Sequence, residues 1–392
     1  MTYHYVILGA GRQGTAAAYD LVRWGEASRV ILADMDLALA QAAADRVNRL
    51  TGLNLAEAQT VDVSDETALT AFLRGQDALL SAVPYRFNLG IARAAVAAGC
   101  HMADLGGNTD VVRAQLALHQ SAVAAGVSLI PDCGLMPGLG NTLAVYALEQ
   151  MEAPREVRIW VGGLPQRPRP PFNYLLTFNI RGLTNEYSGH AIYLRQGRIT
   201  AVEALTEPEE IEFPQPVGRC QAFVTSGGTS TCPETFAGRL QVYEEKTVRY
   251  PGHLAQLQTM KDLGLLDPTP IQVGATLVAP RDVFEALMAP RITFPGDPDV
   301  VVLRVQCRGR HGAEEIEHTL DLMDFYDAET GLTAMERTTG FPAAMVVAMM
   351  ARGQTPRGAV PLECAVPARP TVDGLRARGI RLTERVTITR SL

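Results

Sequence analysis

Three glycines near the start of the chain have the spacing of a dinucleotide-binding loop. Tyr5 to Gly14 reads YVILGAGRQG, so that Gly9, Gly11 and Gly14 follow an apolar run in GxGxxG spacing, and Asp34 ends a second apolar run twenty positions later. The first glycine allows a tight turn, the second lets the backbone approach a pyrophosphate, and the third lets a helix lie close to the strand. The free N–H groups of that helix then attract the phosphates. Because an expected strand precedes the motif and an expected helix follows it, we predict a dinucleotide site rather than a glycine turn without a ligand.

Two aspartates indicate which dinucleotide is bound. Asp34 is placed to accept hydrogen bonds from the adenosine ribose, and Asp36 adds a second negative charge that a 2′-phosphate would have to approach. Arg12, inside the loop, offsets part of this repulsion. The expected cofactor is therefore NAD rather than NADP. The predicted cofactor-binding residues are Gly9, Gly11, Arg12, Gln13, Gly14, Asp34, Asp62, Val63, Ala82 and Val83.

Two lysines stand out because every other basic residue is arginine. Of the 35 Lys and Arg residues only Lys246 and Lys261 are lysine, and lysine, unlike arginine, can be tuned to act as a base. Lys261 is best explained as a solvated charge near a helix end. Lys246 lies in YEEKTVRYPGH with Arg249 and His253. Its alternative role is an exposed structural ion pair with Glu244 or Glu245. Since strand residues alternate between faces, Lys246 and Arg249 are expected to point to opposite faces unless a bulge intervenes.

Composition excludes several classes of function. The net charge of -7 gives no basic face for nucleic acid. An expected strand begins by residue 5, which leaves no room for a signal peptide, and no apolar run approaches the roughly 18 residues of a membrane span. We therefore expect a cytoplasmic protein without nucleic-acid or membrane partners. The six cysteines and the histidines show no metal-ligand spacing, so we expect reduced thiols and no metal.

The pattern of secondary-structure signals changes near the middle of the chain, which predicts more than one domain. Strand and helix signals alternate over residues 1–132, with helices expected over 37–50, 66–73, 88–98 and 111–125. This pattern is typical of an α/β fold with a doubly wound parallel sheet, a Rossmann domain. From about Pro154, short alternating runs separated by Pro and Gly predict a second α+β domain with a mainly antiparallel sheet. The segment TTGFPAAMVVAMMARG predicts an apolar helix with Pro342 early in it, packed on the first domain. The expected units are therefore 1–132 (cofactor), 133–340 (substrate and dimerisation) and 341–392 (a helix and tail returning to the Rossmann domain).

Several motifs together resemble those of the saccharopine dehydrogenase-like family. They are LGAGRQG, SAVPYRFN, ADLGGN, PDCGLMPG, VGGLPQRPRPPFNY, TSGGTSTCP and EEKTVRYPGH, and the resemblance continues to TTGFPAAM. Within the family the chain most resembles the NAD-dependent lysine 6-dehydrogenases. The resemblance implies oxidative deamination of the side-chain amine of L-lysine by NAD, which gives the 6-semialdehyde, ammonia and NADH. Two alternatives are reductive amination of the saccharopine dehydrogenase or carboxynorspermidine synthase type, and an NAD-sensing protein without turnover.

The implied reaction assigns roles to particular residues. The amine must be neutral when hydride leaves, so a base must take its proton. His253 and Lys246 are the candidate bases, and Tyr85 completes the predicted catalytic set. A substrate carboxylate needs a planar donor, for which Arg249 is the first choice and Arg181 the second. Asp104 and Asp132, at strand ends, are expected either to hold an ammonium group or to cap turns. The neutral substrate-binding candidates are Tyr85, Asn88, Tyr174, Ser226 and Thr229.

The second domain also suggests how copies of the chain associate. Its alternating strands are able to continue a sheet across a twofold axis, and homodimers are the commonest symmetric assembly. We therefore expect a homodimer or a dimer of dimers.

Overall fold

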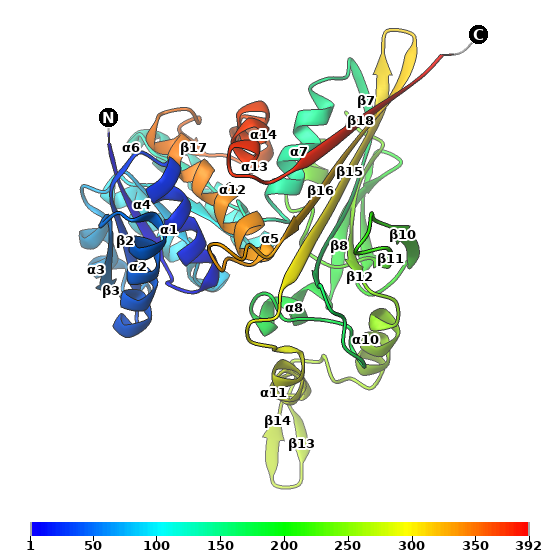
Figure 1. Ribbon diagram of the computed structural model, residues 1–392, viewed down its shortest axis with the longest axis horizontal. Coiled ribbons are helices and arrows are strands. Elements are labelled where there is room, and N and C mark those ends of the chain that lie inside the picture. Colours follow the sequence, from blue (N-terminus) through cyan, green and yellow to red (C-terminus); the bar gives the residue numbers. More distant parts are fainter. Residues whose placement is uncertain (1, 391–392) are drawn as a thin grey trace.

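The computed structural model describes residues 2–390, which form two units side by side (Figure 1). The first unit is built on a seven-stranded sheet in the order β17-β6-β5-β4-β1-β2-β3, in which every pair is parallel. The strand order reverses beside β1, so the carboxyl ends of β1 and β4 border the place where a ligand binds in such sheets. The strands are β1 Tyr3–Leu8, β2 Ala27–Asp34, β3 Ala56–Thr60, β4 Ala78–Ser81, β5 His101–Asp104, β6 Ser128–Ile130 and β17 Gly358–Ala359.

Helices cover both faces of this parallel sheet. Successive residues of β1 belong to two separate cores, because Tyr5 and Ile7 pack on one face and Val6 and Leu8 on the other. Both faces are therefore apolar, which explains the uninterrupted hydrophobic runs and confirms the predicted doubly wound fold. The helices are α1 Arg12–Trp24, α2 Leu37–Thr51, α3 Glu66–Leu73, the short 3-10 helix η1 Tyr85–Phe87, α4 Asn88–Ala98, α5 Thr109–Leu116 and α6 His119–Ala125.

One expected helix is divided in two. The segment 111–125 forms α5 and α6, separated by a turn at Ala117 and Leu118. Near the end of α5, Gln115 donates from its buried side chain to Asp104 Oδ2 at 2.7 Å. This contact fixes α5 to the end of β5, and the chain turns before α6 continues along the sheet.

The second unit is a nine-stranded sheet that confirms the predicted antiparallel domain. Its main path is β10-β11-β12-β7-β15-β16-β18, with β8 and β9 attached to β12, and only β12 and β7 pair in parallel. The strands are β7 Ala153–Pro165, β8 His190–Arg195, β9 Arg198–Glu203, β10 Glu209–Glu212, β11 Arg219–Phe223, β12 Val242–Arg249, β15 Asp299–His311, β16 Glu314–Phe325 and β18 Leu382–Thr389. The helices of this part of the chain are α7 Leu139–Leu148, α8 Ile180–Glu186, α9 Cys232–Thr235, α10 His253–Asp262 and α11 Pro280–Ile292.

The C-terminal part of the chain returns to the first unit and then leaves it again. Helix α12 (Ala334–Ala351) packs on α1, and a β-carbon on Gly340 would lie 2.9 Å from that of Ala16, so glycine allows the close approach. The helix begins earlier than expected because Thr333 and Glu336 form a capping box, and Pro342 is therefore inside the helix. After α12, β17 joins the first sheet, helices α13 Leu362–Ala365 and α14 Ala368–Ala377 follow, and β18 joins the second sheet. Within residues 2–390, no helix combines the length and apolar composition needed to cross a membrane.

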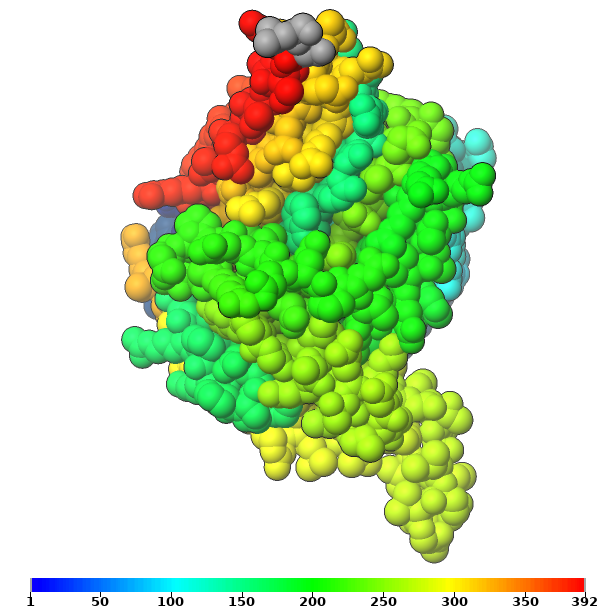
Figure 2. All heavy atoms as spheres, turned by 90° about the vertical axis from the view of Figure 1, so that its right-hand side faces the viewer, coloured from blue at the N-terminus to red at the C-terminus, as the bar shows by residue number. Residues whose placement is uncertain are grey.

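A two-stranded arm projects from the second unit. Strands β13 (Ile271–Val273) and β14 (Thr276–Val278) pair only with each other, between α10 and α11. Both views show the hairpin standing away from the body of the molecule, at the bottom of Figure 1 and at the lower right of Figure 2.

Candidate functional site

The glycine-rich turn after β1 has the geometry that a pyrophosphate requires. Gly9 has a φ of +98° and lies so close to β4 that a β-carbon would come within 2.8 Å of the Ala82 carbonyl oxygen. A β-carbon on Gly14 would collide with the Gly9 carbonyl oxygen, whereas one on Gly11 would meet no heavy atom within 4 Å. Gly9 and Gly14 are thus required by packing, and Gly11 is required only if something else occupies the space beside it. Among the described residues no side chain caps α1, so the N–H groups of its first turn are available to a ligand.

Two aspartates lie at the end of β2, beside the same loop. Asp34 accepts hydrogen bonds from the backbone N–H of Ala10 at 2.9 Å and of Asp36 at 3.1 Å. Asp36 caps α2 by accepting from Ala38 N–H at 2.9 Å. A 2′-phosphate on a ribose held by Asp34 would therefore approach two fixed carboxylates. Between them in sequence, Met35 is 70% exposed, an apolar surface suited to the flat face of an adenine ring.

Two further observations indicate that the glycine-rich loop after β1 fits a dinucleotide. Gln13 Oε1 is buried and has no hydrogen-bond partner among the described residues, so it is left for a ligand donor. Val83 lies against Gly9, with Cγ1 3.1 Å from the position of a β-carbon there, which places the β4 end beside the loop together with Ala82. Asp62, in contrast, is an exposed residue after β3 that binds Ser64, and Val63 is buried in the core of the first unit.

Two buried aspartates occupy the carboxyl ends of β5 and the loop after β6. Asp104 accepts from Gly106 N–H (2.8 Å), Asp132 N–H (3.1 Å) and Gln115 Nε2 (2.7 Å), so both of its oxygens are used to fix the two loops. Asp132 has a φ of +65° and accepts from Ser230 Oγ of the second unit. Its Oδ1 lies against Gly106, where a β-carbon would collide with it. Burial, and then the nearby charge of Asp104, raise the pKa of Asp132 to about 8.

The loop that carries Ser230 connects these aspartates to β12. Gly228 lies against Glu245, since a β-carbon on it would collide with Glu245 Oε2. Ser226 donates to the Asn185 carbonyl oxygen at 2.9 Å, and Asn185 Nδ2 is 3.4 Å from Tyr85 Oη. The contacts therefore join the two units. We call this set the interdomain polar cluster: Tyr85, Asp104, Asp132, Asn185, Glu186, Ser226, Ser230, Glu245 and Arg249.

Arg249 is the buried cation of the cluster. It is 4% exposed, and its Nε donates to Tyr187 Oη at 3.1 Å while Nη1 donates to the Val248 carbonyl oxygen at 2.9 Å. Its guanidinium carbon lies 4.9 Å from the centre of the Tyr174 ring. Taken as a whole residue, Arg249 is the most deeply buried arginine of residues 2–390. A planar donor is thus held rigidly at the end of β12.

His253 supports Arg249 and does not act as an accessible base. Its Nδ1 lies 3.0 Å from the Phe172 carbonyl oxygen and its Nε2 lies 2.9 Å from Tyr187 Oη. Because a carbonyl oxygen only accepts, Nδ1 carries the hydrogen and Nε2 accepts from the tyrosine. Burial and the charge of Arg249 lower the pKa of His253 to about 3. His253 is therefore neutral and orients Tyr187, which in turn orients Arg249.

Two glutamates complete the cluster. Glu186 Oε2 lies 3.7 Å from Arg249 Nη2, one third of its side chain is exposed, and partial burial raises its pKa to about 7. Glu245 is 2% exposed, and its Oε2 has no hydrogen-bond partner among the described residues. Burial and the charge of Glu186 raise the pKa of Glu245 well above its usual range. Neither glutamate was predicted as a site residue. Strand alternation could have identified Glu245, because it is four positions from Arg249 on β12 and therefore lies on the same face.

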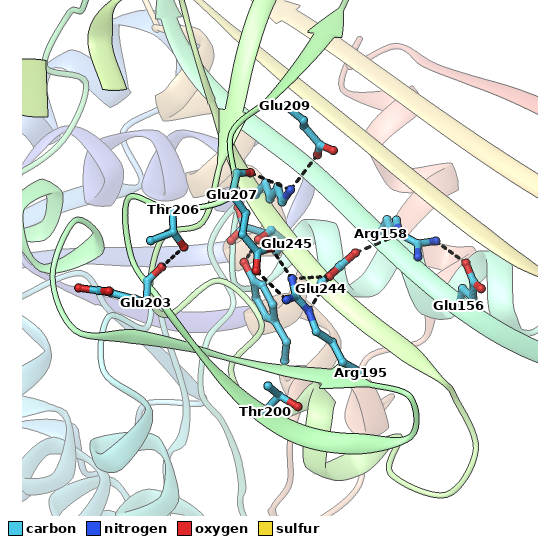
Figure 3. Close-up of polar contacts among 12 residues, drawn as sticks. Glu156, Arg158, Arg195, Thr200, Glu203, Thr206, Glu207, Glu209, Glu244 and Glu245 are labelled. Atoms are coloured by element: carbon cyan, nitrogen blue, oxygen red, sulfur yellow. Dashed lines mark hydrogen bonds and ion pairs between the residues drawn. The ribbon is translucent and has the colours of Figure 1, made fainter. Parts of the chain in front are cut away.

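Lys246 faces away from this cluster, as alternation from Arg249 predicts. In the parallel pairing of β12 with β7, Lys246 lies beside Trp160, and Glu245 lies beside Ile159. Trp160 and Ile159 pack in two different cores on opposite faces of the sheet, and Ile159 is on the face covered by α7. Lys246 Nζ donates to the Glu207 carbonyl oxygen at 3.0 Å and lies 3.4 Å from Glu209 Oε1. Figure 3 shows the ion pairs of this outer face, which join Arg158, Arg195 and Glu244. Lys246 thus forms an ion pair, but with Glu209 and not with Glu244 or Glu245 as expected. The base assignment to Lys246 is not supported.

The other predicted substrate residues are divided between the cluster and the core. Tyr85 and Ser226 belong to the cluster, and Tyr174 lines its base, but Asn88 is buried within the first unit, where it accepts from Ser81. Thr229 donates to the Ile192 carbonyl oxygen and is buried. Arg181 is exposed and paired with Asp282 and Glu285 of α11, so it is not available to a substrate in the cluster. Within residues 2–390, no group of three or more His, Cys, Asp or Glu side chains is arranged to hold a metal.

A separate hollow of about 200 Å³ lies beside Arg12. Its walls come from Arg12, residues 175–177, five residues between Thr293 and Asp299, and Glu336 near the start of α12. It contains neither Asp132 nor Arg249. We assign the chemistry to the interdomain polar cluster because buried ionisable groups from both units converge there, whereas the hollow is an opening next to the glycine loop.

Comparison with known proteins gives the same fold and names a family. The family model described as "Saccharopine dehydrogenase NADP binding domain" matches residues 5–130, and that described as "Saccharopine dehydrogenase C-terminal domain" matches residues 134–380. The apo structure of saccharopine dehydrogenase (L-Glu forming) from Saccharomyces cerevisiae has a TM-score of 0.78 at 19% identity and covers 98% of this chain and 100% of its own. The homospermidine synthase of Legionella pneumophila in complex with NAD has a TM-score of 0.64 at 11% identity, over 99% of this chain and 92% of its own.

Curated relatives agree at the level of sequence. Saccharopine dehydrogenase [NADP(+), L-glutamate-forming] of Pyricularia oryzae is 26% identical over 53% of this chain and 47% of its own length. The mitochondrial alpha-aminoadipic semialdehyde synthase of Bos taurus is 22% identical over 82% of this chain and 42% of its own length. The chain thus spans about half the length of the curated relatives that it matches. Because the two family models together cover almost the whole chain, this protein belongs to the saccharopine dehydrogenase family.

Proposed function

We propose that the protein is an NAD-dependent oxidoreductase that oxidises the side-chain amine of L-lysine to an imine. Water then hydrolyses the imine, giving the 6-semialdehyde and ammonia, and the hydride leaves as NADH. The observation that carries this proposal is the set of ionisable side chains in the interdomain polar cluster. One buried arginine, Arg249, is accompanied by four carboxyl groups, those of Asp104, Asp132, Glu186 and Glu245. A substrate with one carboxylate and two amino groups complements this arrangement, and lysine has that composition.

Four side chains of the cluster then have a role. Arg249 binds the substrate carboxylate through Nη2, which makes no hydrogen bond to the described residues. Glu186 and Glu245 accept from the α-ammonium group, which satisfies the free Glu245 Oε2. Asp132, whose pKa is raised to about 8, takes the proton that makes the side-chain amine neutral. A bound nicotinamide dinucleotide supplies the hydride acceptor.

The preference for NAD rests on the end of β2. The curated relatives described above include enzymes named for NADP(+), so this chain would differ from them. Asp34 and Asp36 are both held in place by backbone hydrogen bonds and would repel a 2′-phosphate. A pair of like charges near the surface costs about 1–4 kcal/mol at 4 Å, depending on solvent screening. Replacing Asp36 with serine, which retains a helix cap, should therefore raise the affinity for NADP relative to NAD.

Saccharopine is the second candidate substrate, because family models named for saccharopine dehydrogenase match both units. It carries three carboxylates and needs further cations. Arg281 is a candidate, since it donates to Asn185 Oδ1 at 3.2 Å and to Ser188 Oγ at 2.9 Å on the same helix wall. To bind saccharopine, Arg281 would have to release Asn185 and Ser188 and bind a substrate carboxylate instead.

The deciding experiment is a substrate and cofactor matrix with the purified full chain. Lysine and saccharopine are each supplied with NAD and with NADP, and formation of the reduced cofactor is followed by absorbance. The reverse direction is tested with an amino acid, an aldehyde or keto acid, and reduced cofactor. We expect lysine with NAD to be the productive pair. Turnover of saccharopine but not lysine would establish the second candidate, and NAD binding without turnover of any amine would leave a sensing protein.

A further inference from the structure

Ser230 is buried in a backbone conformation that serine rarely adopts. Its φ is +46°, in the left-handed region, and only 4% of the residue is exposed. A residue with a β-carbon is less stable in this region than glycine, and such conformations persist mainly where they serve a functional site. Glycine would adopt the same φ without strain but has no hydroxyl group. The strain therefore indicates a use for the hydroxyl group of Ser230.

The hydroxyl group of Ser230 contacts a second residue in the same unusual conformation. Ser230 Oγ donates a hydrogen bond to Asp132 Oδ2 across the boundary between the two units. Asp132 has a φ of +65° and is also 4% exposed. The two strained positions thus meet in one buried hydrogen bond.

The loop that carries Ser230 is fixed to other parts of the chain. Thr231 Oγ1 donates to Glu363 Oε1 of α13 at 2.8 Å. Glu234 forms an ion pair with Arg113 of α5, in which the closest nitrogen and oxygen atoms are 2.5 Å apart. The hydroxyl group of Ser230 is therefore presented from a fixed loop.

The other ionisable groups around Asp132 do not favour a negative charge on it. The groups that face it are two carboxyl groups and two thiols: Asp104 on β5, Glu363 on α13, the adjacent Cys133, and Cys232 of α9. The carboxyl groups repel a negative charge on Asp132, and burial raises the pKa of both thiols well above the usual range, so that they are neutral. The Ser230 hydroxyl group acts in the opposite direction, because a hydrogen bond to a carboxylate favours its ionised form.

We propose that Ser230 is a positioning residue that keeps Asp132 able to accept a proton from the substrate ammonium group. This proposal rests on the proposed function, in which Asp132 is the base. Among the described residues, Asp132 Oδ2 accepts from Ser230 and Oδ1 accepts no hydrogen bond. Oδ1 is thus left for the substrate. In the transfer a substrate N–H bond breaks, an Oδ1–H bond forms, and Ser230 keeps its own proton.

Two substitutions separate the hydroxyl group from the backbone conformation. Ser230→Ala removes the hydroxyl group and keeps the β-carbon, with its strain, whereas Ser230→Gly removes both. Gln196→Gly is the matched control for the backbone change. Gln196 also has a positive φ, of +50°, but it is exposed between β8 and β9 and lies outside the interdomain polar cluster. Thermal unfolding of the full-length protein confirms that each variant is folded.

The first readout is the dependence of kcat on pH with lysine and NAD. Burial and the charge of Asp104 raise the pKa of Asp132 to about 8, so the wild-type rate should rise with pH and level off above about 8. Without the Ser230 hydroxyl group this rise should move to higher pH by about one unit or more in both Ser230 variants. Near pH 7 their kcat should therefore be about tenfold lower or less than that of the wild type. Gln196→Gly should leave the rise in place.

The second readout needs no substrate. The protonated Asp132 carboxyl stabilises the fold at acid pH, and this contribution is lost as pH rises through the pKa of Asp132, about 8. In both Ser230 variants the decline in the free energy of unfolding should therefore continue about one pH unit further than in the wild type. When Asp132→Asn is also present, the Ser230 substitutions should no longer change the pH dependence.

The two readouts distinguish failure of this proposal from failure of the proposed function. A displaced decline in stability, without turnover of lysine by the wild type, would reject the reaction and leave Ser230 as the residue that sets the ionisation of Asp132. Turnover of lysine with the same pH dependence in wild type and both Ser230 variants would overturn the role of Ser230. A change in Ser230→Gly that is absent from Ser230→Ala would also overturn it, because the effect would then come from the backbone.

Discussion

Replacement of Arg249 with lysine tests the interdomain polar cluster without removing its positive charge. A lysine has no equivalent of Nε, so the 3.1 Å hydrogen bond to Tyr187 is lost, together with the planar geometry that presents Nη2 to a carboxylate. A hydrogen bond to a charged group contributes about 1.5–3 kcal/mol. At about 1.4 kcal/mol per factor of ten, kcat/KM for lysine should fall by about 10- to 150-fold. Because the carboxylate is remote from the reacting amine, most of the loss should be in KM.

The assay measures initial rates of NADH formation against lysine concentration, with NAD affinity measured separately by calorimetry. Arg181→Lys is the matched control, since Arg181 lies on the helix wall of the same unit but is 69% exposed and forms surface ion pairs. Such pairs contribute about 0–1 kcal/mol, so this variant should change kcat/KM by less than about fivefold. An unchanged KM in Arg249→Lys, or an equal loss in Arg181→Lys, would refute the assignment of the substrate carboxylate to Arg249.

Further predictions address the loop, the base and the outer face. Gly11→Val should fold normally, because its side chain enters open space, yet weaken NAD binding by about tenfold or more because it occupies the phosphate position; calorimetry showing normal affinity would contradict this. Gly14→Ala should lower the melting temperature, because its β-carbon collides with the Gly9 carbonyl oxygen, and an unchanged melting curve would count against that packing. Asp132 accepts a proton only when ionised, so with its pKa raised to about 8 the value of kcat should rise with pH and level off above about 8; Asp132→Asn should abolish this limb, and survival of the limb would assign it to another group. The protonated Asp132 carboxyl also stabilises the fold at acid pH, and this contribution is lost as pH rises through about 8. In denaturant titrations, the free energy of unfolding of Asp132→Asn should therefore fall less than that of the wild type as the pH is raised through about 8. Lys246→Ala should keep the rate within about twofold of wild type, because Lys246 and its partner Glu209 lie on the face of β12 that points away from the cluster, and a large loss of kcat would return Lys246 to the catalytic set.

The parts of the site that depend on local sequence were predictable. Gly9, Gly11 and Gly14 act within one turn, and their roles follow from backbone sterics that need no distant contact. Asp104 and Asp132 were identified as strand ends because apolar runs mark parallel strands, whose carboxyl ends lie along one edge of the sheet. Alternation also predicted that Lys246 and Arg249 face opposite ways.

The parts that depend on distant contacts were not predictable. The burial of His253 is set by Phe172 and Tyr187, which are far from it in sequence. Glu186 enters the cluster only because α8 packs beside the end of β12, and the parallel pairing of β12 with β7 has no local signal. The start of α12 was an exception, since Thr333 and Glu336 have the spacing of a capping box that was readable in the sequence.

The route of the C-terminal segment has a consequence for how the protein is made. The nucleotide-binding unit takes its outer strand from Gly358–Ala359 and the partner of α1 from α12, and the second sheet takes an edge strand from Leu382–Thr389. A nascent chain that has emerged only as far as residue 132 would leave the face of α1 that packs on α12 uncovered, so we expect the first unit to reach its final structure late in synthesis. Neither half is therefore a promising fragment for separate expression, and ribosome-bound chains should become resistant to protease only after nearly the whole polypeptide has emerged.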